Sequence, residues 1–106
     1  MTCILKPMIR DLKIHAKYNG IKINETSLKG AIAFLEKNEL IHAPTLFVSD
    51  NGVLTLQWDN KQLYFTVEFK DDQFTYDCHV YNSNIKGTGT TRRLADITKI
   101  VKTIRI

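Results

Sequence analysis

Cysteine, proline, tryptophan and histidine are all scarce in this sequence. Its 106 residues include two cysteines, two prolines, one tryptophan and three histidines. Cys3 and Cys78 lie far apart and neither has a Cys-x-x-Cys partner, so we expect two free thiols in a reducing compartment and no disulfide. No two histidines have the i, i+4 spacing of a helical metal site. The sequence therefore predicts no metal ion and no cofactor.

Long apolar runs are also missing. No segment approaches the roughly 20 consecutive apolar residues that cross a bilayer, and the first residues lack the charged-then-apolar pattern of a secretion signal. The apolar share of 43% and the charged share of 25% are typical of a globular protein. We expect one domain over residues 1–106, located in the cytoplasm and without contact to a membrane.

Charge is unevenly distributed along the chain, although the net charge is only +4. Residues 1–29 carry six Lys/Arg against two acidic residues, residues 30–81 carry three against eight, and residues 82–106 carry six against one. A basic beginning and a basic end therefore flank an acidic middle. If the two ends meet in space, one face of the molecule attracts anions and another attracts cations.

The first part of the chain favours a helix, with one alternative. Apolar residues recur at helical spacing and Pro7 suits a first turn, which predicts a short helix over roughly residues 5–16. Apolar alternation through residues 12–23, around Asn19-Gly20, fits a β-hairpin instead. The helix is the preferred interpretation, and the hairpin stays open as its alternative.

A second helix follows, and then the apolar period changes. Asn24 or Thr26 can cap this helix, whose apolar stripe consists of Leu28, Ala31, Ile32 and Leu35. From Thr45 the period falls from about 3.6 to 2. Short turns separate four strands, at residues 50–52, 59–61 and 71–72. Because such turns cannot make parallel crossovers, residues 45–81 are predicted to form an antiparallel meander.

Alternation also assigns the two faces of this sheet. The residues expected in the core are Leu54, Leu56, Trp58, Leu63, Phe65, Val67, Phe69, Phe74, Tyr76, Cys78 and Val80. Those expected to point outward are Thr55, Gln57, Tyr64, Thr66, Glu68, Thr75, Asp77, His79 and Tyr81. A sheet that is polar on one face needs cover on the other, which the helices would supply.

The end of the chain is predicted to be a loop and a helix. Residues 82–90 have the composition of a flexible loop, and Thr90 or Thr91 can cap a last helix over about residues 91–104. The predicted fold class is therefore α+β, with N-terminal helices, a four-stranded meander and a C-terminal helix.

Several motifs resemble a recurring pattern in small bacterial and phage proteins. Tyr18-Asn19-Gly20 ahead of a helix is similar to an aromatic–Asp/Asn–Gly loop in that group, and Leu54-Thr55-Leu56-Gln57-Trp58 is similar to its Leu-x-Trp strand. Tyr18 stands where the group usually has Trp, and Gln57 stands where it usually has an acidic residue. The resemblance implies the same helix-and-meander fold and a bacterial or phage origin, and it implies no catalytic residue.

No set of residues in the sequence has the arrangement of a catalytic site. Cys78 and His79 are adjacent, but neighbours on a strand point to opposite faces, so the imidazole cannot reach the sulfur. Asp71-Asp72 fill a hairpin turn, where aspartate bonds the local backbone. The sequence therefore predicts no catalytic residue and no enzyme.

Two surfaces are candidates for binding. The outward sheet face carries tyrosines among short polar and acidic groups, which suits contact with another protein through Tyr64, Glu68, Asp77, His79 and Tyr81. The end of the chain carries cations before and along a helix, which suits an anion or nucleic acid bound by Lys86, Arg92, Arg93, Lys99, Lys102 and Arg105. If the two ends of the chain converge, the second surface also includes Lys6, Arg10, Lys13 and Lys17.

These surfaces lead to two expectations of function. The first is a non-catalytic protein, encoded by a phage or mobile element, that inhibits or modulates a protein complex of its bacterial host, as an anti-CRISPR, another anti-defence protein or an antitoxin does. The alternative is a nucleic-acid-binding protein that uses the basic C-terminal helix and the Lys86–Arg93 segment. Either would act in the cytoplasm of the host, as a monomer or a homodimer, since an edge strand can pair between subunits.

Overall fold

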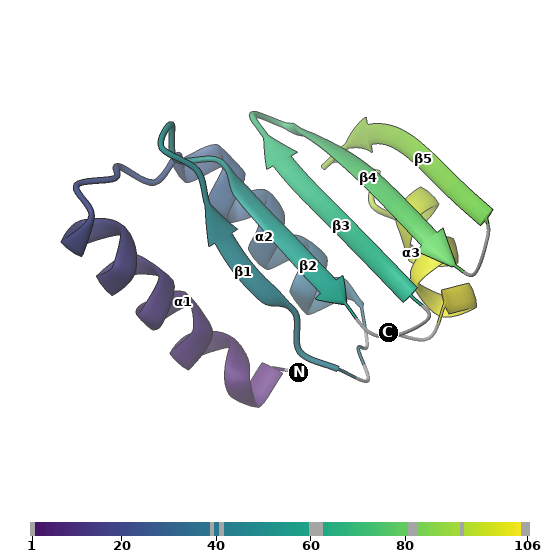
Figure 1. Cartoon of the computed structure of the whole chain (residues 1–106), viewed down its shortest axis with the longest axis horizontal. Helices are drawn as coiled ribbons and strands as arrows, with labels where there is room; N and C mark the ends of the chain where they lie inside the picture. Colours follow the sequence, from purple (N-terminus) through teal and green to yellow (C-terminus); the bar gives the residue numbers. More distant parts are fainter. Residues whose placement is uncertain are drawn as a thin grey trace.

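The part of the chain that the structure describes folds into two layers, a five-stranded antiparallel sheet and three helices (Figure 1). The computed structural model describes residues 2–38, 40, 42–59, 63–80, 83–91 and 93–104, with side chains from Lys6 onward. The elements in chain order are α1 (Thr2–Tyr18), α2 (Glu25–Lys37), β1 (Thr45–Val48), β2 (Leu54–Asp59), β3 (Leu63–Lys70), β4 (Gln73–Val80), β5 (Ser83–Thr90) and α3 (Ala95–Ile104). The strands lie side by side in chain order. The predicted α+β class and antiparallel meander are confirmed.

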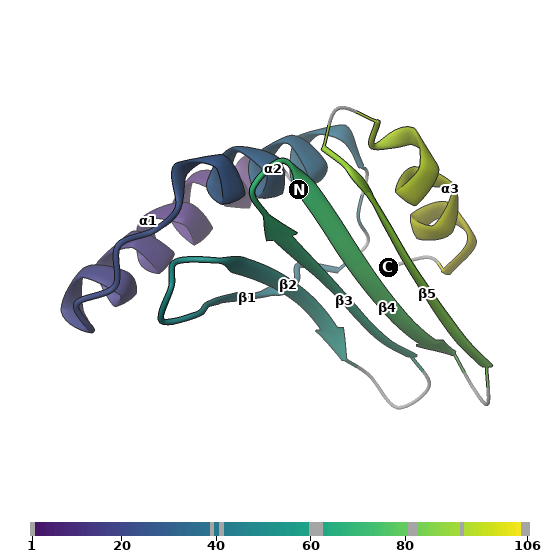
Figure 2. The ribbon, with the colours of Figure 1, turned by 90° about the horizontal axis from the view of Figure 1, so that it is seen from above.

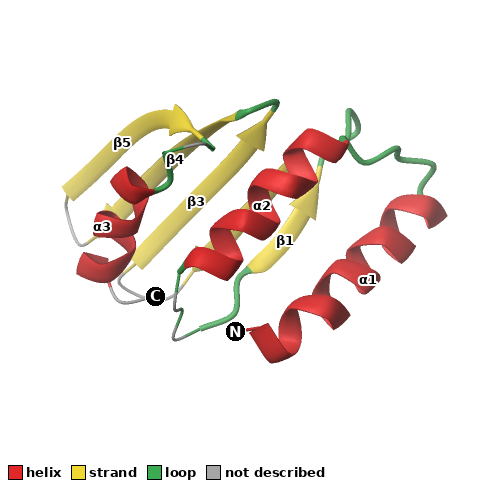
Figure 3. Ribbon diagram, turned by 180° about the vertical axis from the view of Figure 1, so that it is seen from behind, coloured by secondary structure: helices red, strands yellow, loops and turns green. Residues whose placement is uncertain are grey.

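All three helices lie on the same face of the sheet. Seen from above, α1, α2 and α3 are on one side of the strands, and the opposite side is open (Figure 2). Seen from behind, α2 lies between α1 and α3 (Figure 3). The basic first and last helices are therefore separated by α2, and they do not form one continuous basic patch.

The core lies between the helices and the sheet, and its members from β2, β3 and β4 are those that alternation predicts. Nine of these eleven side chains are buried, and Tyr76 and Val80 pack against them while partly exposed. The ring of Phe34 connects the two layers, because its centroid lies 6.1 Å from Trp58 and 5.8 Å from Phe69. Aromatic pairs at such separations stabilise a core beyond the burial of their area.

The fifth strand corrects the sequence prediction, which places a flexible loop at residues 82–90. Ser83–Thr90 pairs with β4 along its whole length, although none of its residues is fully buried. Its core-facing positions include Gly87 and Gly89, which lie opposite Tyr76 and Phe74. A Cβ on Gly87 would lie 2.4 Å from the Tyr76 hydroxyl, and one on Gly89 would lie 2.5 Å from the Phe74 ring. The two aromatic rings of β4 therefore occupy the space that β5 side chains would otherwise fill.

Helix α1 is longer than predicted, and the hairpin alternative for residues 12–23 is wrong. The helix continues to Tyr18 and contains Pro7 in its interior rather than in its first turn. Gly20 ends it with φ of +69°, donating its N–H to the Lys17 carbonyl, while Ile21 donates to the Ala16 carbonyl at 2.8 Å. This pair of bonds is a Schellman C-cap, so the Asn-Gly sequence terminates a helix here instead of turning a hairpin.

Helix α2 is joined to the sheet by polar as well as apolar contacts. Of the two predicted caps, Asn24 and Thr26, Asn24 is the N-cap, since its side chain accepts the N–H of Ser27 at 2.8 Å. Ser27 is fully buried, and its hydroxyl donates to the Phe69 carbonyl while accepting the N–H of Leu54 at 2.9 Å. Leu54 and Phe69 are paired across β2 and β3, so one serine connects the helix to two central strands.

Helix α3 begins later than the sequence predicts. Thr90 belongs to β5, and Thr91 uses its N–H and its hydroxyl to bond the Asp72 carbonyl in the turn between β3 and β4, at 2.8 and 3.0 Å. The first helical bond instead joins the Thr98 N–H to the Leu94 carbonyl. Neither threonine therefore caps α3, because Thr90 lies in β5 and Thr91 is bonded to the turn between β3 and β4.

Candidate functional site

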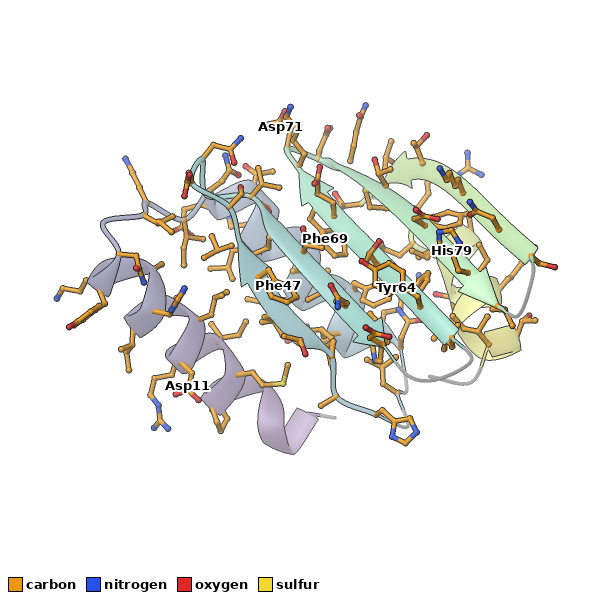
Figure 4. All side chains as sticks on the ribbon, viewed as in Figure 1. Asp11, Phe47, Tyr64, Phe69, Asp71 and His79 are labelled. Atoms are coloured by element: carbon orange, nitrogen blue, oxygen red, sulfur yellow. The ribbon has the colours of Figure 1, made fainter. Side chains whose placement is uncertain are left out.

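The open face of the sheet carries most of the residues that the sequence predicts for protein contact. Tyr64 of β3 and His79 of β4 are direct cross-strand partners, and their ring centroids lie 6.1 Å apart. Both side chains project from the open face toward the viewer in Figure 4. Tyr64 is 37% exposed and His79 is also exposed. The two rings form an aromatic pair at the solvent surface of a continuously hydrogen-bonded sheet.

Phe47 adds a second exposed ring to this face. It lies on β1 opposite Thr55, is 48% exposed and projects from the same side of the sheet as Tyr64 (Figure 4). Phe47 is absent from the surface that the sequence predicts. The signal for it was present, because three consecutive apolar residues, Leu46-Phe47-Val48, cannot all face the core from a single strand.

Two carboxylates lie on neighbouring strands of the same face. Glu68 is exposed on β3 and is paired with Thr75, while Asp77 follows two residues later on β4, so the two acids are diagonal neighbours. His79 Nε2 lies 3.1 Å from Asp77 Oδ1. The ring N–H is not aimed at that oxygen, which accepts no hydrogen bond among the described residues. Asp77 and His79 are therefore close neighbours on this face, although no hydrogen bond joins these two atoms.

Lys86 lies on this face as well. It is directly opposite Asp77 on the edge strand β5. The charged side chains on the open face of the described strands are Asp59, Glu68, Lys70, Asp77 and Lys86. Acids and bases are thus mixed, with one more acid than base.

Cys78 and His79 do not form a reactive pair. Cys78 is fully buried in the core, whereas His79 lies on the open face, as alternation requires. Burial raises the pKa of the Cys78 thiol, and the negative charge of Asp77 raises that pKa further. The thiol is therefore protonated at neutral pH and packs as a small apolar group.

Among the described residues that were predicted to bind an anion or nucleic acid, Lys86 is separated from Lys99 and Lys102, which share one helix. Lys86 lies on the open face, whereas Lys99 and Lys102 belong to α3, on the covered side of the sheet (Figure 2). Arg93 is exposed in the connection between β5 and α3. Since Lys86 to Thr90 form a strand, this segment is not a loop leading into a helix N-terminus. Three predicted binding residues lie outside the described residues: Tyr81, Arg92 and Arg105.

Among the described side chains, no three His, Cys, Asp or Glu residues are grouped closely enough to hold a metal ion. Within the described ranges, every helix is too short or too polar to cross a bilayer.

Comparison with protein-family models, with curated proteins and with solved structures gave no match to this chain. The resemblance to small bacterial and phage proteins therefore stays a prediction.

Proposed function

We propose that this chain is a non-catalytic protein-binding module, and that it contacts its partner through the open face of the sheet around Tyr64. The observation that carries the proposal is the exposure of aromatic rings on that face. Tyr64 and Phe47 contribute little to the core from these positions, yet both are held on strands whose backbone is fixed by pairing on the sheet. Aromatic side chains on a rigid support are typical of the residues that dominate protein–protein affinity.

The surroundings of Tyr64 fit a protein partner better than a nucleic acid. Its neighbours across the strands are Asp59 and His79, and the next rows contain threonine, glutamine, the carboxylates of Glu68 and Asp77, and Lys86 opposite Asp77. Stacked bases would bring phosphates close to these carboxylates, which opposes binding. A partner that presents Arg or Lys beside an apolar patch would complement both the rings and the acids.

The biological role belongs to the same proposal. A module of this kind would inhibit or modulate a host complex by covering a surface of its partner that the complex requires for assembly or activity. The anti-CRISPR, anti-defence or antitoxin role in a bacterial cytoplasm is part of the proposal in this sense, and its support is the sequence resemblance alone.

The test compares three baits of the full-length protein in bacterial extract, with bound proteins quantified by mass spectrometry. The baits are the wild type, Tyr64→Ala combined with His79→Ala, and the control Lys99→Ala on the opposite side of the sheet. We expect at least one protein to bind the wild type and the control, and to be depleted about tenfold on the double variant, consistent with loss of one aromatic hot spot.

Three outcomes oppose the proposal. Equal binding to all three baits places the contact elsewhere, and the absence of any specifically bound protein removes the basis for a protein-binding role. Binding that disappears after nuclease treatment, and falls with Lys99→Ala, favours the nucleic-acid alternative. Circular dichroism of each bait must show an unchanged fold, so that depletion reports the surface rather than unfolding.

A further inference from the structure

A second surface lies on the helical side of the molecule, between α1 and α2, which run side by side (Figure 3). A groove of about 580 Å³ separates their outer sides, and it is lined by Lys6, Ile9, Arg10, Lys13, Ile14, Lys17, Ile32 and Glu36. The open sheet face is on the other side of the strands (Figure 2). This groove is therefore separate from the surface of the proposed function.

Three isoleucines, Ile9, Ile14 and Ile32, give the groove an apolar part. Ile14 is 60% exposed, while Ile9 and Ile32 are partly buried. Helix α1 packs on the core through Leu12 and Ala16, which are both buried, and through the inner side of Ile9. Ile14 therefore extends the two partly exposed isoleucines into one apolar strip along the groove, and contiguous exposed apolar surface of this kind marks binding sites.

The rim of the groove is strongly cationic. The charged lining residues from α1 are Lys6, Arg10, Lys13 and Lys17, all of them exposed, against one carboxylate, Glu36 of α2. Their spacing of four, three and four residues aligns the four cations along one side of α1. Eleven residues of α-helix rise about 16 Å, so the cations form a row roughly three turns long.

From this geometry we infer that the groove binds an amphipathic α-helix with an acidic flank, supplied by a partner protein. The apolar stripe of such a helix would cover Ile14 and Ile32, and its carboxylates would face Arg10 and Lys13. A helix repeats its side chains at the same three- and four-residue spacing as the cation row, so one acidic flank can meet the whole row. Burial of the isoleucines supplies affinity, and the charges set orientation and association rate.

Two other anionic partners fit the groove less well. A nucleic acid would pair its phosphates with the cations but would leave the isoleucines without an apolar partner. A bilayer surface is broad and flat, whereas Ile9 and Ile32 are partly covered in a recess between two helices. Only a narrow, convex and apolar element with acids beside its stripe satisfies both parts of the surface.

The probe for this inference is a fluorescent synthetic helix of about 15 residues, or four turns, with leucine at i, i+3, i+4 and i+7 and glutamate beside that stripe. Its matched control has the same composition in scrambled order. Fluorescence anisotropy against the full-length protein is expected to show saturable binding of the helix, weakened by added salt, and about tenfold weaker binding of the scrambled peptide.

Variants of the protein locate the binding. Lys13→Glu and Ile14→Asp are expected to weaken the helix about tenfold each. Lys99→Glu makes the same charge change on α3, outside the groove, and is expected to leave affinity unchanged within about twofold. Tyr64→Ala is also expected to have no effect, so this inference and the proposed function fail or succeed separately.

The inference is overturned if the helix does not bind, if the scrambled peptide binds equally, or if Lys99→Glu weakens binding as much as Lys13→Glu. It is also overturned if duplex DNA or phosphatidylserine vesicles bind in a Lys13-dependent manner more tightly than the helix does. Because Ile14 and Lys13 are exposed, both variants are expected to fold, and an unchanged thermal melting curve for each verifies that expectation.

Discussion

Tyr64 and Phe65 are neighbours on β3, yet they belong to two faces of the sheet with different physical demands. Phe65 is completely buried and packs against Trp58 with centroids 5.6 Å apart, whereas Tyr64 is 37% exposed beside His79. The covered face determines whether the chain folds, because its rings fill the space under the helices. Side chains on the open face do not fill the core, so folding does not require them to be apolar. Its aromatic side chains therefore need another explanation, and binding is the one that we propose.

The largest expected effect is on the covered face. Phe65→Ala removes a fully buried ring from the centre of the core and should lower the free energy of unfolding by about 3–5 kcal/mol. Urea denaturation followed by circular dichroism measures this loss. A change below about 1 kcal/mol would mean that the two faces do not differ as described.

A smaller loss is expected where the covered face is polar. Ser27→Ala leaves the Leu54 N–H and the Phe69 carbonyl buried without their partner, which should lower the free energy of unfolding by about 1–3 kcal/mol. Thr103→Ala on the exposed side of α3 is the matched control and should change it by less than about 0.5 kcal/mol. Equal effects for the two variants would show that the buried serine link is not stabilising.

The difference between the two faces also explains which parts of the fold could be predicted from the sequence. Apolar alternation placed Trp58 and Phe65 in the core and Tyr64 on the surface correctly, because a period of two encodes the face directly. Apolar alternation could not predict β5, because its core-facing positions include Gly87 and Gly89, which have no side chain and therefore give no alternating pattern. The rings of Tyr76 and Phe74, which belong to another strand, complete that part of the core.

The candidate site was predictable only in part, for a related reason. Strand parity is local, so it places residues such as Asp77 and His79 together without knowledge of the fold. The side of the sheet that a helix covers depends on the tertiary structure and cannot be predicted from strand alternation. For this reason Lys86, on the open face, and Lys102, on α3, lie on opposite sides of the sheet. Ile14 was ambiguous because the same residues fitted a hairpin until the Schellman cap at Gly20 identified the end of a helix.

On the open face, removal of a ring should cost little stability. Tyr64→Ala removes one cross-strand contact with His79 and should lower the free energy of unfolding by about 1 kcal/mol or less. The comparison with Phe65→Ala in the same urea experiment is direct, because the two positions are adjacent. A loss as large as that of Phe65→Ala would assign Tyr64 a structural role and weaken the case for binding.

The smallest effect appears only at alkaline pH. Burial and the charge of Asp77 raise the pKa of the Cys78 thiol above its ordinary value of 9.0. As the pH rises above 9.0, the unfolded chain therefore releases the thiol proton before the folded chain does. The free energy of unfolding declines over this range, from pH 9.0 up to the pKa of the folded state. Cys78→Ala should show a shallower decline of unfolding free energy above pH 9.0 than the wild type. Parallel curves would contradict the raised pKa.

Covalent capture can show directly whether the open face of the sheet is the binding surface. Benzoylphenylalanine in place of Tyr64 and, separately, in place of Lys99 would be irradiated in bacterial extract, and adducts would be identified by mass spectrometry. We expect an adduct with one defined protein from position 64 and none with that protein from position 99. Adducts from position 99 alone, or none from either position, would contradict this expectation.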